Sequence, residues 1–154
     1  MAADKIGFVN IKKVLFESER GKIAAQELKQ YVDKKKAQIQ SKEAELKKLK
    51  EGFEKQRSIL TDSAYREKEL NYQKKFRDYK RFIEDSNEEM KLKDREVTQK
   101  LIPEIQKVVN AIGEKEGYTA IFDIGTSGLF YASKESDITD LMIKQFNKAS
   151  RSKK

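Results

Sequence analysis

The feature that most constrains this chain is an apolar heptad seam that occurs twice, in two runs of equal length. Steps of four and three residues lead from Leu28 to Leu60 and again from Tyr65 to Val97, and seven of the ten positions in each run are apolar or aromatic. A period of 3.5 residues sustained over this length predicts helices that coil around a partner helix. Because only a short break at residues 60–63 separates the runs, we expect an antiparallel helical hairpin.

The composition agrees with a hairpin that buries one narrow stripe. Charged residues make up 39% of the 154 residues and hydrophobic residues only 37%, which disfavours a single large core. High charge with a preserved apolar period favours a coiled coil over disorder. Such an arm is suited to reach, hold or space other molecules, and it leaves no room for a buried active site.

The charge balance is basic and uneven. Lys and Arg number 34 against 26 acids, for a net charge of +8, and residues 42–81 hold 13 basic and 8 acidic residues, a difference of +5. We expect a basic arm surface and a basic tail at 151–154, both favouring anionic partners. The candidate residues of the arm surface are Lys47, Lys48, Lys50, Lys55, Arg57, Arg66, Lys74, Lys75, Arg77, Lys80 and Arg81.

The sequence offers little for catalysis. It contains no cysteine and no histidine, which excludes thiolate chemistry, zinc sites of the usual kind and imidazole acid–base catalysis. Gly21-Lys22 lacks the glycine cradle of a phosphate loop. We expect neither an enzyme nor a cofactor. The apolar stretches are also too short to span a membrane.

The two ends of the chain predict a small body. Residues 6–9 read as a strand, a brief helix follows around residues 14–16, and Ser18 is the expected N-cap of a first long helix over 18–60. We expect Asp62 and Ser63 to cap the return helix. The only proline, Pro103, coincides with a phase shift of the seam, so we expect a joint between arm and body there.

The C-terminal part predicts two more strands and a helix. Gly117 ends the return helix, residues 118–124 form a strand, residues 125–128 make a tight turn, and residues 129–132 return as a further strand. Asp137 caps a final helix whose apolar face is Ile138, Leu141, Met142 and Phe146.

The predicted fold is therefore α+β, with a long coiled-coil arm on a small β-sheet body. We assign residues 1–20 and 101–150 to the body and residues 21–100 to the arm, whose tip lies near 60–63. A sheet of three short strands has exposed edges and a thin core, so we expect it to oligomerise. The expected oligomerisation residues are Ile6, Phe8, Ile121, Phe122, Leu129, Phe130 and Tyr131.

A few apolar residues of the arm fall off the seam. Because the arm has no further core to fill, they are candidates for weak contacts with the apolar surface of another protein: Tyr31, Ile59, Leu70, Phe82 and Leu92. The aromatic residues Tyr65, Tyr72, Phe76 and Tyr79 keep heptad spacing and are expected in the seam. Acids interleave with the lysine runs, so nucleic-acid binding is disfavoured.

Both ends of the chain resemble the Skp/OmpH family of periplasmic chaperones. The resemblance lies in residues 6–10 with 14–22, including Ser18-Glu19-Arg20-Gly21-Lys22, and in residues 117–123, 129–132 and Asp137-Ile138-Thr139-Asp140. It implies a homotrimer with a small shared β-barrel, whose arms enclose a cavity. It further implies ATP-independent holding of unfolded outer membrane proteins, and contact of the basic arms with a negatively charged membrane or lipopolysaccharide.

The resemblance also implies a periplasmic location. Met1-Ala2-Ala3-Asp4 is consistent with a start methionine placed ahead of a mature terminus, so we expect the export signal to be missing from the sequence. Three alternatives stay open from the residues alone: a structural or tethering coiled coil, a basic nucleic-acid-binding coiled coil, and a prefoldin-like cytosolic chaperone.

Overall fold

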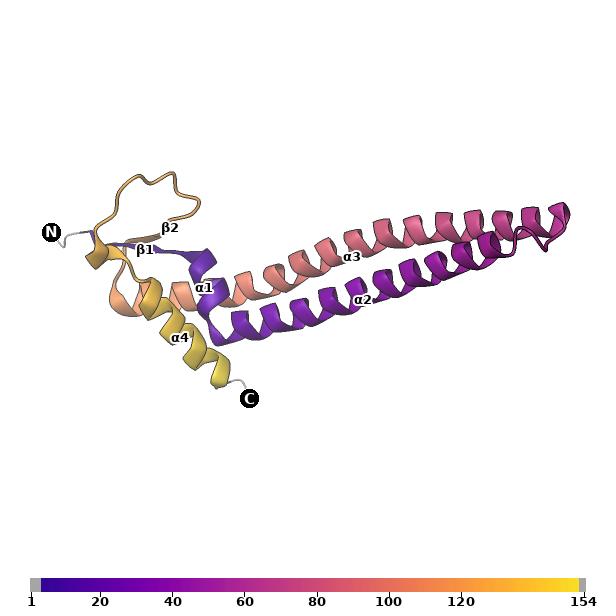
Figure 1. The fold of residues 1–154 in the computed structure, drawn as a ribbon. Helices are drawn as coiled ribbons and strands as arrows, with labels where there is room; N and C mark the ends of the chain where they lie inside the picture. Colours follow the sequence, from indigo (N-terminus) through magenta and orange to yellow (C-terminus); the bar gives the residue numbers. More distant parts are fainter. Residues whose placement is uncertain (1–3, 153–154) are drawn as a thin grey trace. The chain divides into compact units, whose positions relative to one another are not determined.

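The structure, a computed structural model, describes residues 4–152 and consists mainly of two long helices (Figure 1). Contacts divide the chain into two compact units, an arm of residues 29–93 and a body formed by the remaining residues of both ends. In chain order the elements are β1 (Ile6–Val9), α1 (Ile11–Glu17), α2 (Glu19–Lys55), α3 (Asp62–Glu116), β2 (Ala120–Asp123), the 3₁₀ helix η1 (Lys134–Ser136) and α4 (Thr139–Arg151).

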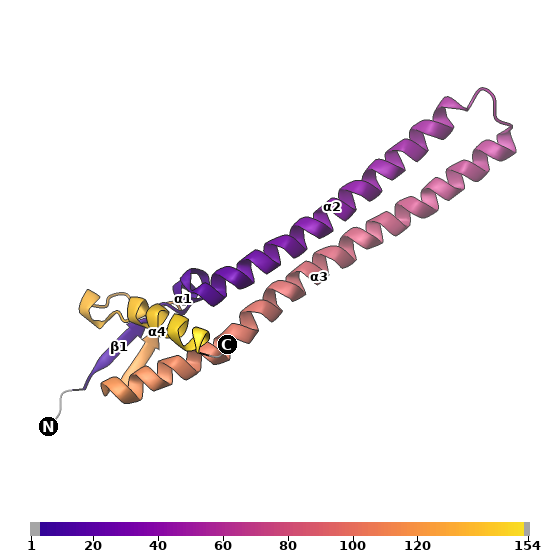
Figure 2. The same cartoon turned by 90° about the horizontal axis from the view of Figure 1, so that it is seen from below.

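The arm is the predicted antiparallel helical hairpin. In it α2 and α3 lie side by side along its length, as both views show (Figures 1 and 2). Leu46 and Phe53 are buried at the contact, whereas Leu28, Val32 and Ile39 stay partly exposed. A two-helix contact covers only one stripe of each helix, so much of the surface of the arm stays open to solvent.

The tip of the arm differs from the prediction in two details. The first long helix ends at Lys55 rather than at Leu60. The expected caps, Asp62 and Ser63, were wrong, because Thr61 Oγ1 accepts a hydrogen bond from the Ala64 backbone N–H at 3.2 Å. Thr61 is therefore the N-cap, and Asp62 instead lies in the first turn, where a negative charge favours the helix dipole.

The sheet of the body has two strands in the described residues, and they are parallel. Ile6 pairs with Ala120 and Val9 with Asp123. The predicted strand at residues 129–132 was wrong, since that segment has no regular structure. The place next to β1 is taken by the segment before α4, where the Ile138 N–H donates to the Phe8 carbonyl at 2.8 Å.

A local turn explains why the predicted third strand is absent. The Asp123 carboxylate accepts hydrogen bonds from the Gly125 N–H at 3.2 Å and the Thr126 hydroxyl at 3.1 Å. The Asp123 carbonyl accepts a further bond from the Ser127 N–H. These bonds direct the chain away from β2 instead of into a hairpin. Residues 129–132 therefore find no strand partner within the described chain.

The body core joins residues from both ends of the chain. Helix α4 supplies Met142 and Phe146, which are almost completely buried, and the final helix thus uses its predicted face, apart from the more exposed Leu141. The buried apolar cluster is formed by Val9, Val14, Leu101, Ile105, Ile112, Ile138, Met142 and Phe146. Burying side chains of this size contributes about 1.5–3 kcal/mol each, so this small cluster supplies most of the stability of the body.

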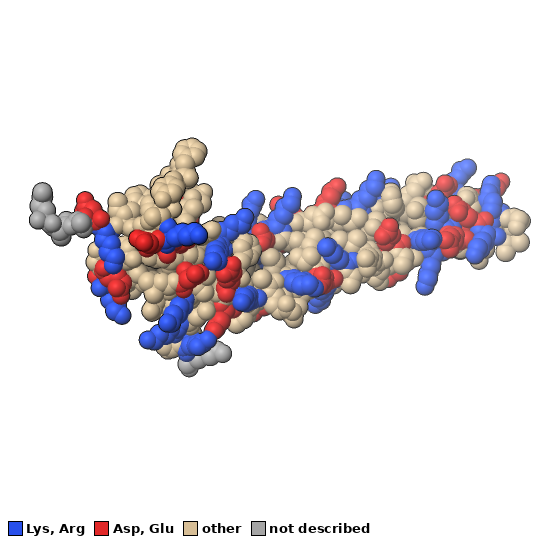
Figure 3. Space-filling model, turned by 60° about the vertical axis from the view of Figure 1, so that its left-hand side comes forward, with Lys and Arg blue, Asp and Glu red and all other residues tan. Residues whose placement is uncertain are grey.

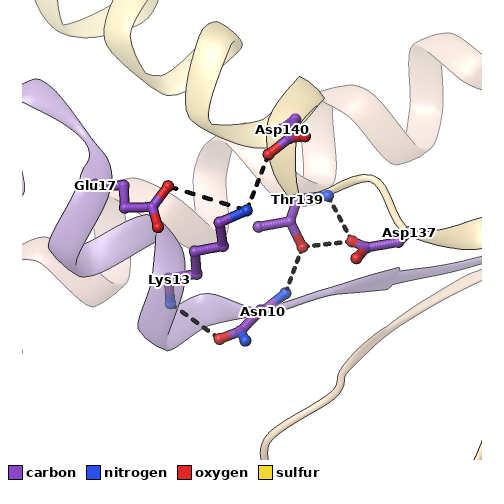
Figure 4. A network of polar contacts seen from close by, with 6 residues as sticks. All are labelled: Asn10, Lys13, Glu17, Asp137, Thr139 and Asp140. Atoms are coloured by element: carbon purple, nitrogen blue, oxygen red, sulfur yellow. Dashed lines mark hydrogen bonds and ion pairs between the residues drawn. The ribbon is translucent and has the colours of Figure 1, made fainter. Parts of the chain in front are cut away.

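Polar contacts connect the end of β1 to the start of α4 (Figure 4). The Asn10 N–H donates to Thr139 Oγ1 at 2.9 Å, and the Thr139 N–H donates to Asp137 Oδ1 at 2.9 Å. Lys13 pairs with Asp140 at 3.2 Å, and this contact raises the pKa of Lys13. Asp137 thus supports the first turn of α4, although Ile138 occupies the cap position.

Two glycines of α2, Gly21 and Gly52, differ in how much space is available for a side chain. A Cβ atom at Gly21 would lie 1.6 Å from the Leu15 carbonyl oxygen, so the backbone of α1 approaches α2 too closely for any side chain there. Ser18, which is completely buried, accepts a hydrogen bond from the Gly21 N–H at 3.1 Å and confirms the predicted N-cap. A Cβ atom at Gly52, by contrast, would meet nothing within 4 Å.

We expect Gly21→Ala and Gly52→Ala to shift stability in opposite directions. Gly21→Ala must displace the backbone of α1 and should lower the free energy of unfolding by roughly 3 kcal/mol or more. Gly52→Ala should raise the stability of the arm by up to about 1 kcal/mol, since alanine is the better helix former. Thermal unfolding followed by circular dichroism measures both. Equal effects of the two substitutions would contradict the close α1–α2 contact.

Candidate functional site

Three of the apolar residues predicted off the seam lie open on the arm. Ile59 is 80% exposed, Leu70 is 58% exposed and Leu92 is 55% exposed. They are separated along the helices, with Ile59 in the turn at the tip and the others on α3. Isolated apolar side chains of this kind do not form a core, and they are accessible to another molecule.

The other two predicted residues, Tyr31 and Phe82, are half-buried and belong to the contact between the helices. The Tyr31 hydroxyl donates to Glu89 Oε2 at 3.1 Å, which connects α2 to α3. Lys35 Nζ lies 5.8 Å from the ring centroid of Tyr31 and 5.8 Å from that of Phe82. Lys42 Nζ lies 4.9 Å from the Phe82 ring. Each ring is therefore partly covered by a cation.

Lys35 itself occupies a seam position and is paired there with Glu89. Hydrogen bonding to Glu89 raises the pKa of Lys35. Hydrogen bonds from Lys35 and then from Tyr31 lower the pKa of Glu89. Nearby, Ser86 is fully buried, and its hydroxyl has no hydrogen-bond partner among the described residues. This section of the seam is a polar layer, in which an ion pair and a hydrogen bond connect α2 to α3 beside the Tyr31 and Phe82 rings.

A row of aromatic rings fills the distal seam as predicted. Phe53 of α2 contacts Tyr65 and Tyr72 of α3, with ring centroids 5.5 Å and 5.8 Å apart. The row continues from Tyr72 to Phe76 at 6.0 Å and from Phe76 to Tyr79 at 6.4 Å. Phe53 packs on two of these rings across the hairpin, and the other contacts lie within α3, so the rings are seam residues first and are not a free stacking platform.

All eleven predicted basic residues of the arm surface are exposed. Figure 3 shows lysine and arginine side chains along the arm, with acidic side chains between them. Arg57 pairs with Asp62 at 3.1 Å and lies over the Tyr65 ring, and Lys50 has Glu54 at 3.8 Å. Lys80 lies over the Phe76 ring. The remaining eight make no ion pair within residues 4–152, so their charges are available to an anionic partner: Lys47, Lys48, Lys55, Arg66, Lys74, Lys75, Arg77 and Arg81.

The structure brings two of these lysines to one groove. Lys48 of α2 and Lys75 of α3 line a groove of about 650 Å³ whose apolar wall includes Leu49 and Tyr79. Desolvation raises the pKa of the Tyr79 hydroxyl. Both lysines were predicted from the sequence, but the groove was not, because it depends on the register between the two helices.

Five of the seven residues predicted for oligomerisation are exposed on the body. Phe8 and Phe122 stack with ring centroids 6.1 Å apart, yet Phe122 stays 45% exposed. Phe130 is fully exposed and Tyr131 is 83% exposed. Ile6 and Leu129 are also exposed, whereas Phe8 and Ile121 are half-buried. Three further apolar residues that were not predicted as interface residues are exposed as well: Phe16, Ile23 and Ile102.

The described residues show no sign of a metal site. Within residues 4–152 no three acidic, histidine or cysteine side chains gather closely enough to hold a metal ion. None of the helices in that range is both long and apolar enough to cross a membrane. The candidate site is the arm surface, with its exposed apolar residues and the eight cations that make no ion pair within residues 4–152.

The chain thus combines a long helical hairpin with a small body that contains a parallel pair of strands. The chain belongs to the family described as outer membrane protein (OmpH-like), whose model matches residues 5–146. The structure is similar to that of a putative OmpH-like outer membrane chaperone from Caulobacter crescentus, with a TM-score of 0.88 and 13% identity. The match covers 97% of this chain and 87% of the other.

Two curated relatives are both named chaperone protein Skp. The protein of Vibrio cholerae is 24% identical over 143 residues, covering 93% of this chain and 83% of the relative. The protein of Pectobacterium atrosepticum is 25% identical over 147 residues, covering 94% and 86%. The matches span nearly the whole chain, so they include both the arm and the body.

The polar layer of the arm predicts a pH dependence. Because the pKa of Glu89 is lowered below its ordinary value of 4.5, its ionised form stabilises the folded arm, and this stabilisation is lost as the pH falls through the folded pKa. Glu89→Gln should lower the melting temperature at neutral pH, and the difference from the parent should shrink in acid. Thermal melts at several pH values measure this.

Glu88→Gln is the matched control, because Glu88 is exposed and makes no ion pair within the described chain. If the two variants melt alike at every pH, the Lys35–Glu89 contact does not stabilise the arm.

Proposed function

We propose that this protein is an ATP-independent holdase chaperone that binds unfolded outer membrane proteins in the periplasm and prevents their aggregation. The observation that carries the proposal is the arm surface, on which Ile59, Leu70 and Leu92 are exposed and on which eight lysines and arginines of residues 47–81 make no ion pair within residues 4–152. The family and the names of the relatives support a chaperone role.

Scattered apolar contacts suit an unfolded client. Each exposed side chain offers only a small apolar area, and burial is worth about 25 cal/mol per Å², so single contacts are weak. Many weak contacts hold a chain without requiring a particular sequence, and the client can leave without an energy source. Ile59, Leu70 and Leu92 are the foremost contacts. Tyr31 and Phe82 contribute with their open edges.

The unpaired cations of the arm supply attraction at longer range. Unfolded outer membrane proteins are commonly acidic, so a basic arm raises the rate of encounter, and salt screens this effect. The same cations also suit a negatively charged membrane surface or lipopolysaccharide. A basic face without the apolar residues would bind anions but would not hold an apolar segment.

We further propose that three copies assemble through the body and that their arms enclose the client. The support is the exposed apolar surface of Phe122, Leu129, Phe130 and Tyr131, together with the outer edge of β2. A two-stranded sheet with an open edge and adjacent aromatic side chains gains stability when another chain covers it. Residues 129–132 would then find in a neighbouring copy the strand partner that they lack within one chain.

Removing the exposed apolar residues should impair holding while the fold persists. We expect Ile59→Ser, Leu70→Ser and Leu92→Ser, combined, to raise the client dissociation rate about tenfold or more and to leave the melting temperature nearly unchanged, because these side chains pack on little. Light scattering of a diluted outer membrane protein and stopped-flow dissociation measure the effect. Phe82→Ser is the contrasting variant, and it should also destabilise the arm.

The complementary change reverses Lys47, Lys48, Lys74 and Lys75 to glutamate. It should slow association and flatten its salt dependence without a matching rise in dissociation. If both sets of variants suppress client aggregation as well as the parent at low and high salt, the arm is not the client-binding surface. A structural or tethering role would then be the better explanation, and steeply salt-dependent binding of nucleic acid would favour the third alternative.

The exposed apolar residues of the body predict which substitution prevents assembly. Phe130→Asp places a charge in the proposed interface and should convert the oligomer to monomers in sedimentation velocity experiments. Ser127→Asp, in the same exposed segment, is the control and should leave assembly intact. Deletion of residues 42–81 should also leave it intact. Monomers from the deletion, or an intact oligomer of Phe130→Asp, would contradict assembly through the body.

A further inference from the structure

A second surface, on the body, has a different chemistry from the arm. Helices α3 and α4 border a groove of about 390 Å³. Its apolar lining includes Val108, Ala111, Leu141 and Ala149, and the core residues Ile112 and Phe146 reach its floor. Leu141, at 37% exposure, lies on the predicted apolar face of α4 but opens to this groove instead of joining the core.

Two of the three lysines that line the groove lie toward one end, whereas the third, Lys115, lies about two turns further along α3, next to Glu116. In the body α3 and α4 run in opposite directions (Figures 1 and 2). Arg20 pairs with Glu104 at 3.1 Å, and Arg151 pairs with the neighbouring Glu19, so the end of α4 lies near residue 104 of α3. Lys107 and Lys148 therefore line the same end of the groove.

These lysines are not neutralised within the described chain. Lys107 and Lys148 are exposed and make no ion pair within residues 4–152. The acid nearest to them in the lining, Glu104, is held by Arg20. The groove thus joins an apolar channel to an end with uncompensated positive charge. An anionic head group there is attracted by the lysines, while an alkyl chain covers the apolar lining.

We propose that this groove binds a single-chain anionic amphiphile, with its alkyl chain between α3 and α4 and its head group at Lys107 and Lys148. The volume lies in the range of small-ligand sites, about 300–1,000 Å³. A protein partner would need roughly 800 Å² of each surface, far more than one short groove offers. The site is separate from the arm and does not rest on the proposed chaperone function.

The test uses the full-length protein in its native assembly and dodecanoate as the probe. Isothermal titration at low salt should show saturable binding, and dodecyl maltoside, which has the same chain without the charge, should bind at least about tenfold more weakly. Lys107→Glu combined with Lys148→Glu should weaken dodecanoate binding by about tenfold or more, since each such lysine contributes about 1 kcal/mol to anionic lipid. Ala111→Trp should block the channel and abolish binding.

Lys144→Glu is the matched control. Lys144 is exposed on α4 and does not line the groove, so its reversal should weaken binding clearly less than the double variant does. The proposal is wrong if dodecanoate does not bind, if dodecyl maltoside binds equally well, or if Lys144→Glu weakens binding as much as the double variant. It is also wrong if Ala111→Trp dissociates the assembly, because the groove is then an interface between copies. The client aggregation assay of each variant tests the proposed chaperone function and does not bear on binding in this groove.

Discussion

The small apolar area that two packed helices can bury constrains the rest of this structure. In the arm, α2 and α3 meet along one stripe, and only a few side chains such as Leu46 and Phe53 are buried there. The stripe is not apolar throughout, because Lys35 and Glu89 form a polar layer and Ser86 is buried among them. An arm held by so narrow a contact keeps most of its side chains in solvent, so its function must lie on its surface.

The body holds together the two ends of the chain. Strands β1 and β2 are far apart in sequence, and a parallel pair of four residues each is weak by itself. Helix α4 covers it with Met142 and Phe146, and the hydrogen bonds among Asn10, Asp137 and Thr139 fix the start of that helix. One face of this small sheet is thereby packed, while its outer edge stays open.

Features set by local sequence were predicted well. The apolar period of the seam, the cap at Ser18, the end of α3 at Gly117 and the strand pattern of residues 6–9 can all be read from neighbouring residues. The errors arose where a distant or competing partner decides. Asp123 turned the chain after β2, so residues 129–132 did not pair, and the pairing of Lys35 with Glu89 depends on the register between helices. The groove that Lys107 lines could not be predicted either, because it depends on how α4 packs against α3.

The two kinds of exposed apolar surface fit different kinds of binding. Leu129, Phe130 and Tyr131 are consecutive and exposed, so one partner segment can cover them together, and backbone hydrogen bonds to that segment would add to the gain. Ile59 and Leu70 are isolated on helical surface, where a partner gains one weak contact at a time. Adjacent residues favour a lasting interface, and scattered ones favour reversible holding. This difference in spacing is why we propose assembly through the body and client contact on the arm.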